Sequence, residues 1–167
     1  RRQLLHLRTA EALEQIHAAN LSPHLATLAE HYRLAGAAAD PEKTVDYLLQ
    51  AGTAAQRAFA YEHAVAHWQT ALDLLPAQRA NAKRRADLLM RLGLLRYDMG
   101  PYHFADALAC YEQAVALYEG SGELALAGKA HAKAGSVLGS TSAATWDMDA
   151  PRALLHYQAA ERLLARA

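Results

Sequence analysis

Apolar residues recur along this chain at spacings of three and four, and short polar segments containing glycine, proline or aspartate separate the periodic stretches. This pattern predicts helices over about residues 2–19, 23–35, 41–59, 61–75, 78–99, 102–119, 123–138 and 150–164. Short connections between successive helices favour antiparallel neighbours. The pattern therefore predicts an all-α chain of about eight antiparallel helices.

The predicted boundaries follow from residues that cap or interrupt helices. Ser22 and Asp40 each precede a proline, a combination typical of a helix start, and Gly36 and Gly100 stand where helices end. The first helix is predicted from apolar residues at helical spacing: Leu4, Leu5, Ala12, Leu13 and Ile16.

Three stretches of the chain align with one another. Each has a pair ending in glycine in its first helix, then alanine, an aromatic residue and alanine in its second helix. The sets are Ala51-Gly52, Ala64, Trp68 and Ala71; Leu92-Gly93, Ala107, Tyr111 and Ala114; and Ala134-Gly135, Ala153, Tyr157 and Ala160. This pattern resembles the tetratricopeptide repeat (TPR), which implies a right-handed superhelix of stacked helical pairs.

Small residues have a physical reason at these positions. Glycine or alanine lets two helices approach closely, and the aromatic ring fills the space beside them. The separation from glycine to the next alanine grows from 12 (52 to 64) to 14 (93 to 107) and 18 (135 to 153). The turns therefore lengthen along the chain, and the third is expected to contain a long loop over residues 139–148 with Trp146.

We expect four segments in one continuous array. Residues 1–39 form a degenerate helical pair or cap, 40–78 a first repeat, 79–120 a second, and 121–167 a third with the long inter-helix loop. The chain begins without methionine inside a helical pattern, so we expect it to be a fragment of a larger protein.

Composition excludes several functions. Lysine plus arginine and aspartate plus glutamate number 17 each, which gives no basic excess for nucleic acid. No apolar run approaches the roughly 20 residues that span a bilayer. A single cysteine, Cys110, and an N-terminus unlike a signal peptide favour a cytoplasmic setting.

The first half of the chain resembles a specific signalling context. The residues that carry the resemblance are Leu28-Ala29-Glu30-His31-Tyr32, Ala35-Gly36, Glu42-Lys43-Thr44-Val45, Tyr61-Glu62-His63-Ala64-Val65 and Leu75-Pro76. They are similar to the helical region after the ATPase core of bacterial STAND-type signalling ATPases, such as LuxR-type and MalT-like regulators and ATPase-linked cyclases. The resemblance implies a sensor or docking arm that controls an ATPase elsewhere in the protein.

Candidate catalytic and metal chemistry is sparse. His63 and His67 lie four residues apart, but no cysteine or carboxylate joins them at zinc-site spacing. Cys110 falls on a packed stripe, where cysteine behaves as a small apolar residue. The chain has no glycine-rich phosphate loop and no nucleophile elbow. We expect neither an enzyme nor a cofactor.

A binding surface is expected instead, because the first helix of each pair lines the concave side of a helical-repeat array. Its partner-facing residues are predicted to be Gln50, Thr53, Gln56, Arg57, Arg91, Leu94, Tyr97, Lys129, Lys133 and Ser136. This polar, mildly cationic set suits an acidic peptide, a helix or a small polar effector.

Three functional hypotheses follow. The first is a non-catalytic protein-interaction or effector-sensing module of a multidomain bacterial signalling or transcriptional regulator, which binds a protein, a peptide or neighbouring domains of its own chain. The second is a free-standing TPR scaffold that joins partner proteins. The third is a small-molecule site under the 139–148 loop, with Trp146 as an aromatic wall.

Overall fold

The structure is a computed structural model that describes residues 1–140 and 148–167. Over these residues it contains eight α-helices and no strand, so the all-α prediction is confirmed there. Trp146 and most of the predicted 139–148 loop lie outside the described residues. The α-helices are α1 (Arg2–Ile16), α2 (Leu25–Ala35), α3 (Pro41–Arg57), α4 (Tyr61–Leu74), α5 (Ala82–Asp98), α6 (Phe104–Ser121), α7 (Leu124–Leu138) and α8 (Ala150–Leu164).

Short 3₁₀ turns occupy four of the connections: Ser22–His24, Gly36–Ala38, Arg79–Asn81 and Pro101–His103. The caps agree with the sequence pattern, since the side chain of Asp40 accepts a hydrogen bond from the backbone N–H of Glu42 at 2.9 Å. Gly122 ends α6 in the left-handed conformation at φ 80°, which costs glycine little because it has no Cβ.

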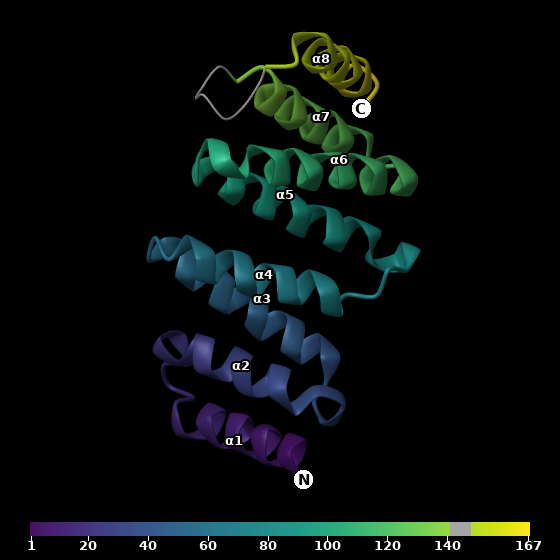
Figure 1. The fold of residues 1–167 in the computed structure, drawn as a ribbon. Helices are drawn as coiled ribbons and strands as arrows, with labels where there is room; N and C mark the ends of the chain where they lie inside the picture. The colour runs from purple at the N-terminus through teal and green to yellow at the C-terminus, as the bar shows by residue number, and fades with distance from the viewer. Residues whose placement is uncertain (141–147) are drawn as a thin grey trace. The chain divides into compact units, whose positions relative to one another are not determined.

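The chain forms two compact units, Arg1–Leu75 and Pro76–Ala167. Within each unit, each helix packs against the next one along the chain, α1 to α4 in the first unit and α5 to α8 in the second (Figure 1). The boundary between the units falls close to the predicted segment boundary at residue 78. The division into four repeat segments forming one array stays a prediction.

The same contact between a glycine and an aromatic ring occurs in three helical pairs. A Cβ atom added at Gly52 of α3 would lie 2.3 Å from the Trp68 ring of α4. The corresponding distance is 2.7 Å from Gly93 to the Tyr111 ring and 3.0 Å from Gly135 to the Tyr157 ring. The accompanying alanines are all buried: Ala64, Ala71, Ala107, Ala114, Ala153 and Ala160. The packing role inferred from the repeated pattern is therefore confirmed.

The first helix forms as predicted, but several of the apolar residues that predicted it are not buried. Leu4, Leu5 and Ile16 are each more than half exposed, whereas Ala10 is buried. Glu14 accounts for this orientation of α1, because its carboxylate faces α2 and α3 rather than water. Polar contacts therefore set the orientation of α1.

Glu14 is the centre of a polar cluster that joins three helices. Its carboxylate accepts hydrogen bonds from the Tyr32 hydroxyl and the Lys43 ammonium, both at 2.7 Å, and from the Tyr47 hydroxyl. The Tyr32 and Tyr47 rings stack with centroids 5.1 Å apart. Burial would raise the pKa of Glu14, but the three hydrogen bonds together hold it below its ordinary value. No glycine of α1 or α2 meets an aromatic ring, and this polar cluster joins the two helices to α3 instead.

Candidate binding pocket

The predicted partner-facing residues of the first unit lie on α3. Gln50 and Arg57 are exposed, and Thr53 and Gln56 are half-buried. The Thr53 hydroxyl donates a hydrogen bond to the Leu49 carbonyl of its own helix at 2.8 Å. This hydroxyl therefore serves the helix as well as the surface, and the structure brings these four residues together only as one helical face.

The second unit brings four of the other six predicted residues to one pocket of about 330 Å³. The walls come from three helices: Leu94, Tyr97 and Asp98 of α5, Tyr111 of α6, and Lys133, Ser136 and Val137 of α7. Leu94, Tyr97, Lys133 and Ser136 were predicted from the sequence, and the structure places them around a shared cavity.

Helical geometry produces this convergence. The lining residues of α5 and those of α7 each follow an i, i+3, i+4 pattern, and side chains at those spacings share one helical face. On α5 the neighbouring residues Gly93 and Leu95 turn inward and are buried. On α7 Ala134 and Gly135 do the same. The buried residues of α5 and α7 thus determine which side chains remain for the pocket.

The pocket combines apolar walls with several polar groups. The Tyr97 ring stacks on Phe104 with centroids 4.8 Å apart, which restrains its orientation. Tyr111 is buried, and burial, assisted by the Asp98 carboxylate, raises the pKa of its hydroxyl. The Tyr111 hydroxyl is therefore neutral at physiological pH.

Opposite charges stand at the pocket rim. Lys133 and Asp98 are both exposed and contribute an ammonium and a carboxylate. The Ser136 hydroxyl donates to the Ala132 carbonyl at 2.9 Å. An ammonium, a carboxylate, phenols and aliphatic walls can together hold a polar side chain or a peptide end.

Arg91 and Lys129 do not line the pocket. Both are exposed and lie about one helical turn before Leu94 and Lys133 on α5 and α7. They extend the cationic character of the surface beyond the pocket rim.

Sequence reasoning missed Asp98, Tyr111 and Val137 as pocket residues. Asp98 stands four residues after Leu94, so the helical period contained a signal for it. Tyr111 was assigned to packing alone and Val137 was given no role, and their part in the pocket depends on contacts between helices that spacing does not reveal.

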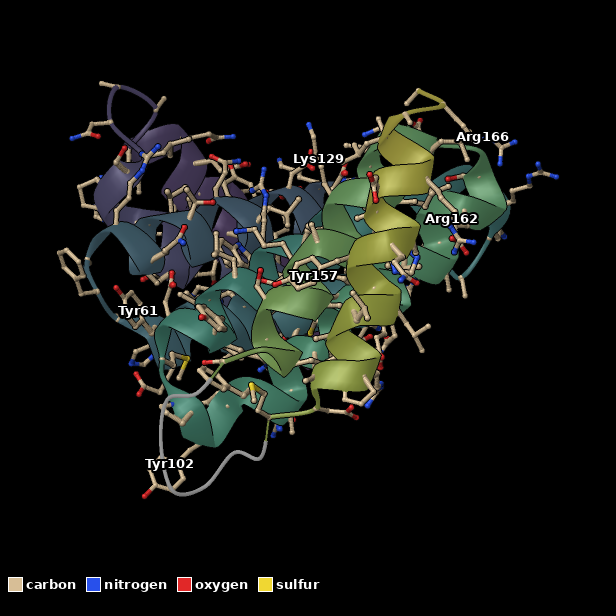
Figure 2. All side chains as sticks on the ribbon, turned by 90° about the horizontal axis from the view of Figure 1, so that it is seen from above. Tyr61, Tyr102, Lys129, Tyr157, Arg162 and Arg166 are labelled. Carbon is tan, nitrogen blue, oxygen red and sulfur yellow. The ribbon has the colours of Figure 1, made fainter. Side chains whose placement is uncertain are left out.

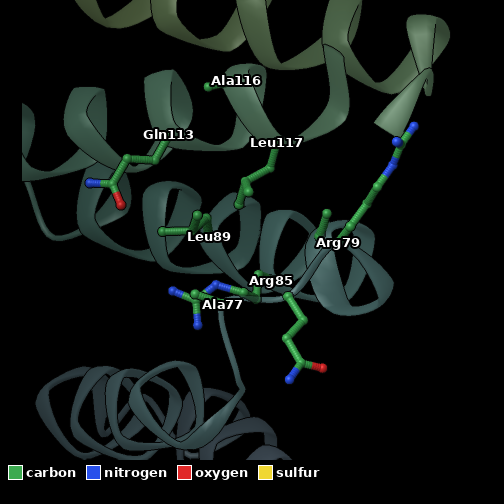
Figure 3. A pocket seen from close by; sticks show the side chains of 9 residues that line it. Ala77, Arg79, Arg85, Leu89, Gln113, Ala116 and Leu117 are labelled. Atoms are coloured by element: carbon green, nitrogen blue, oxygen red, sulfur yellow. The ribbon is translucent and has the colours of Figure 1, made fainter. Parts of the chain in front are cut away.

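A second pocket of about 360 Å³ lies between the N-terminal half of α5 and the C-terminal half of α6 in the same unit. Leu89 and Leu117 form its apolar part together with alanines, as Figure 3 shows, while Arg79 extends away from them. Arg85 and Gln113 add polar groups. None of its lining residues belongs to the predicted surface.

Two residues considered for catalytic or metal chemistry, Cys110 and His67, have shifted pKa values. Cys110 is buried, its sulfur accepts a hydrogen bond from Arg96 at 3.0 Å, and burial raises the pKa of its thiol. A raised pKa makes a thiol a poor nucleophile at neutral pH. Burial and the neighbouring His63 lower the pKa of His67. No group of three potential metal ligands occurs among the described residues.

Comparison with protein-family models gives no match, and comparison with curated proteins gives none either. Among solved structures, the chain is similar to BtubC (BKLC) from P. vanneervenii, with a TM-score of 0.64 and 12% sequence identity. The similarity covers 99% of this chain and 73% of BtubC. At this identity the likeness shows a shared helical fold. Within the described residues, no helix is both long and apolar enough to span a membrane.

Proposed function

We propose that this chain is a non-catalytic interaction or effector-sensing module of tetratricopeptide type, with helical pairs stacked in a right-handed superhelix. The contact between glycine and an aromatic ring, repeated in α3/α4, α5/α6 and α7/α8, supports the repeat assignment. The convergence of Leu94, Tyr97, Lys133 and Ser136 around one pocket is the observation that carries the binding function.

The pocket is proposed as an anchor for a protein or peptide partner. Its opposite charges and hydroxyl groups would orient a polar side chain, and Arg91 and Lys129 would attract acidic residues that follow it. A small polar effector would use the same groups. The similarity of residues 28–76 to the helical region of STAND-type regulators favours a parent protein in which such binding controls an ATPase in a cytoplasmic setting.

Two alternatives remain distinct from this proposal. A free-standing scaffold would use the same pocket without transmitting a signal to another domain. A small-molecule site under the 139–148 loop would depend on Trp146 rather than on Lys133. The sequence of the parent gene distinguishes the free-standing scaffold from the proposed signalling module, since an upstream nucleotide-binding domain would contradict a free-standing scaffold.

Binding should be tested with a displayed library of random peptides and the 167-residue chain as bait. Selected peptides should be acidic, and fluorescence anisotropy should show that Lys133→Glu weakens their binding at least about tenfold. Arg162→Glu is the matched control, because Arg162 is exposed on α8 and does not line the pocket. Figure 2 shows its position on α8. Equal binding by both variants would contradict the proposal, and a loss confined to Trp146→Ala would favour the loop site.

A further inference from the structure

Two histidine rings face each other across the α7/α8 pair. His131 of α7 and His156 of α8 have their Nδ1 atoms 2.9 Å apart and their ring centroids 5.0 Å apart. Their side chains are only 14% and 13% exposed. A separation of 2.9 Å between two nitrogens is that of a hydrogen bond, so one hydrogen must lie between them.

The outer nitrogen of each ring faces a carboxylate on α6. His131 Nε2 lies 3.4 Å from Glu119 Oε1, and His156 Nε2 lies 3.5 Å from Glu112 Oε1. Arg152 of α8 also binds Glu112. Among the residues that the structure describes, the charged groups that these contacts place at the pair are the two α6 carboxylates and the Arg152 guanidinium.

Counting hydrogens shows what this geometry accommodates. A carboxylate accepts but does not donate, so each Nε2 must carry a hydrogen to bond with its glutamate. The Nδ1 atoms then need one further hydrogen between them, which makes three hydrogens on four nitrogens. Two neutral imidazoles carry only two, and two imidazolium rings carry four.

We propose that His131 and His156 form a binding site for one proton, which holds α8 to α7 and α6. With the proton bound, the pair has a single positive charge between Glu119 and Glu112, and all three contacts are hydrogen bonds. Without the proton, one Nε2 lone pair faces a carboxylate. With a second proton, two Nδ1–H groups point at each other and the pair separates.

The contact between His131 and His156 therefore weakens on both sides of an intermediate pH. As the pH rises through the first titration step, the folded state loses a proton that it binds better than the unfolded chain, and stability falls. As the pH falls through the second step, the folded state resists a proton that the unfolded chain accepts near its ordinary pKa of about 6.5, and stability falls again. Burial and the neighbouring His131 lower the pKa of His156, consistent with resistance to the second proton.

Histidine-selective ¹⁵N NMR of the whole chain tests the proton count directly. Across pH 4.5–9, the ring nitrogens of His131 and His156 should titrate together in two separated steps. His156→Gln should leave His131 with a single titration step, because the shared hydrogen between the two rings is lost. Glu112→Gln should lower the pH of the first step by removing a carboxylate that favours the charged pair. Independent single steps in the unaltered chain would overturn the proposal.

Thermal unfolding supplies a second measurement that does not depend on a variant's spectrum. The melting temperature of the unaltered chain minus that of His131→Gln should pass through a maximum with pH, with an amplitude of about 3 °C. His103→Gln is the control in the same unit and should show no such maximum. A difference that is flat with pH would contradict the proposal. Loss of the two NMR steps after EDTA treatment would show that the pair holds a metal ion instead of a proton.

Discussion

The α3/α4 and α7/α8 pairs share one sequence pattern but differ in how deeply they bury its aromatic ring. In α3/α4 the Trp68 ring lies against Gly52 and is 1% exposed. In α7/α8 the Tyr157 ring lies against Gly135 but is 44% exposed, and Figure 2 shows it reaching from α8 over α7. The same motif therefore makes a rigid core in one pair and an adjustable contact in the other.

The second difference is polar. The α3/α4 contact is supported by the Trp68 indole N–H, which donates to the Leu49 carbonyl at 3.3 Å. The α7/α8 pair adds the His131–His156 contact and its two glutamates on α6. Apolar packing is insensitive to pH, whereas the histidine contact depends on it. The pattern of small and aromatic residues therefore sets helix pairing, while other side chains set its stability.

The largest expected effect comes from Gly52→Ala. The added Cβ would lie 2.3 Å from the buried Trp68 ring, which cannot move without disturbing the core. We expect a loss of about 3 kcal/mol of unfolding free energy, the upper part of the usual overpacking range. Urea unfolding followed by circular dichroism measures this loss. A change below about 1 kcal/mol would show that the α3/α4 contact is as adjustable as the α7/α8 contact.

Glu14→Gln tests the pair that lacks the glycine–aromatic contact altogether. The amide keeps the shape of the carboxylate but loses the charge that Lys43, Tyr32 and Tyr47 bind, so we expect a loss of about 2 kcal/mol at pH 7. Urea unfolding of both proteins between pH 3 and 7 measures the difference and its pH dependence.

The sign of that pH dependence follows from the lowered pKa of Glu14. Its contribution is fully present above the unfolded value, near 4.5, and disappears as the pH falls through the folded value. The difference between the two proteins should therefore shrink below pH 4.5. A difference that stays constant down to pH 3 would mean that the charge of Glu14 contributes nothing.

Gly135→Ala is expected to have a much smaller effect than Gly52→Ala. The added Cβ would lie 3.0 Å from the Tyr157 ring, and this partly exposed ring can move by the few tenths of an ångström required. Alanine also favours the helix by up to about 1 kcal/mol, so the net change should stay below about 1 kcal/mol. The same urea titration measures it, and a loss as large as that of Gly52→Ala would remove the distinction between the two pairs.

Gly120→Ala gives the smallest effect and the opposite sign. Gly120 lies in the last turn of α6, and a Cβ there would meet no atom within 4 Å. The substitution should stabilise the protein by about 0.5 kcal/mol through helix propensity alone. It is the matched control for both glycine variants, because the same chemical change is made in open space.

The sequence predicted the helices and the packing of three pairs because both depend on local spacing. Gly93 and Tyr111 illustrate this, since each position is fixed by the period of its own helix. The face of α1 could not be predicted this way. Its orientation depends on Glu14 meeting Tyr32, Lys43 and Tyr47 from two other helices, and apolar periodicity contains no information about such polar contacts.

The candidate pocket was predicted in part for a similar reason. Lys133 and Ser136 belong to one helical face, and the repeat pattern indicates which face remains open. Tyr111 enters the pocket from another helix, so its contribution depends on how the helices cross. The pairing of His131 with His156 is likewise invisible in the sequence, because nothing in their spacing shows which rings meet.

The fit of Trp68 against Gly52 also has an evolutionary consequence. Substitutions at two positions in direct contact do not act independently, so the effect of one depends on the residue at the other. A lineage could replace Gly52 with alanine only after, or together with, a smaller ring at position 68. Related sequences are therefore expected to change these two positions jointly, and that covariation would mark the repeat register even where overall similarity has faded.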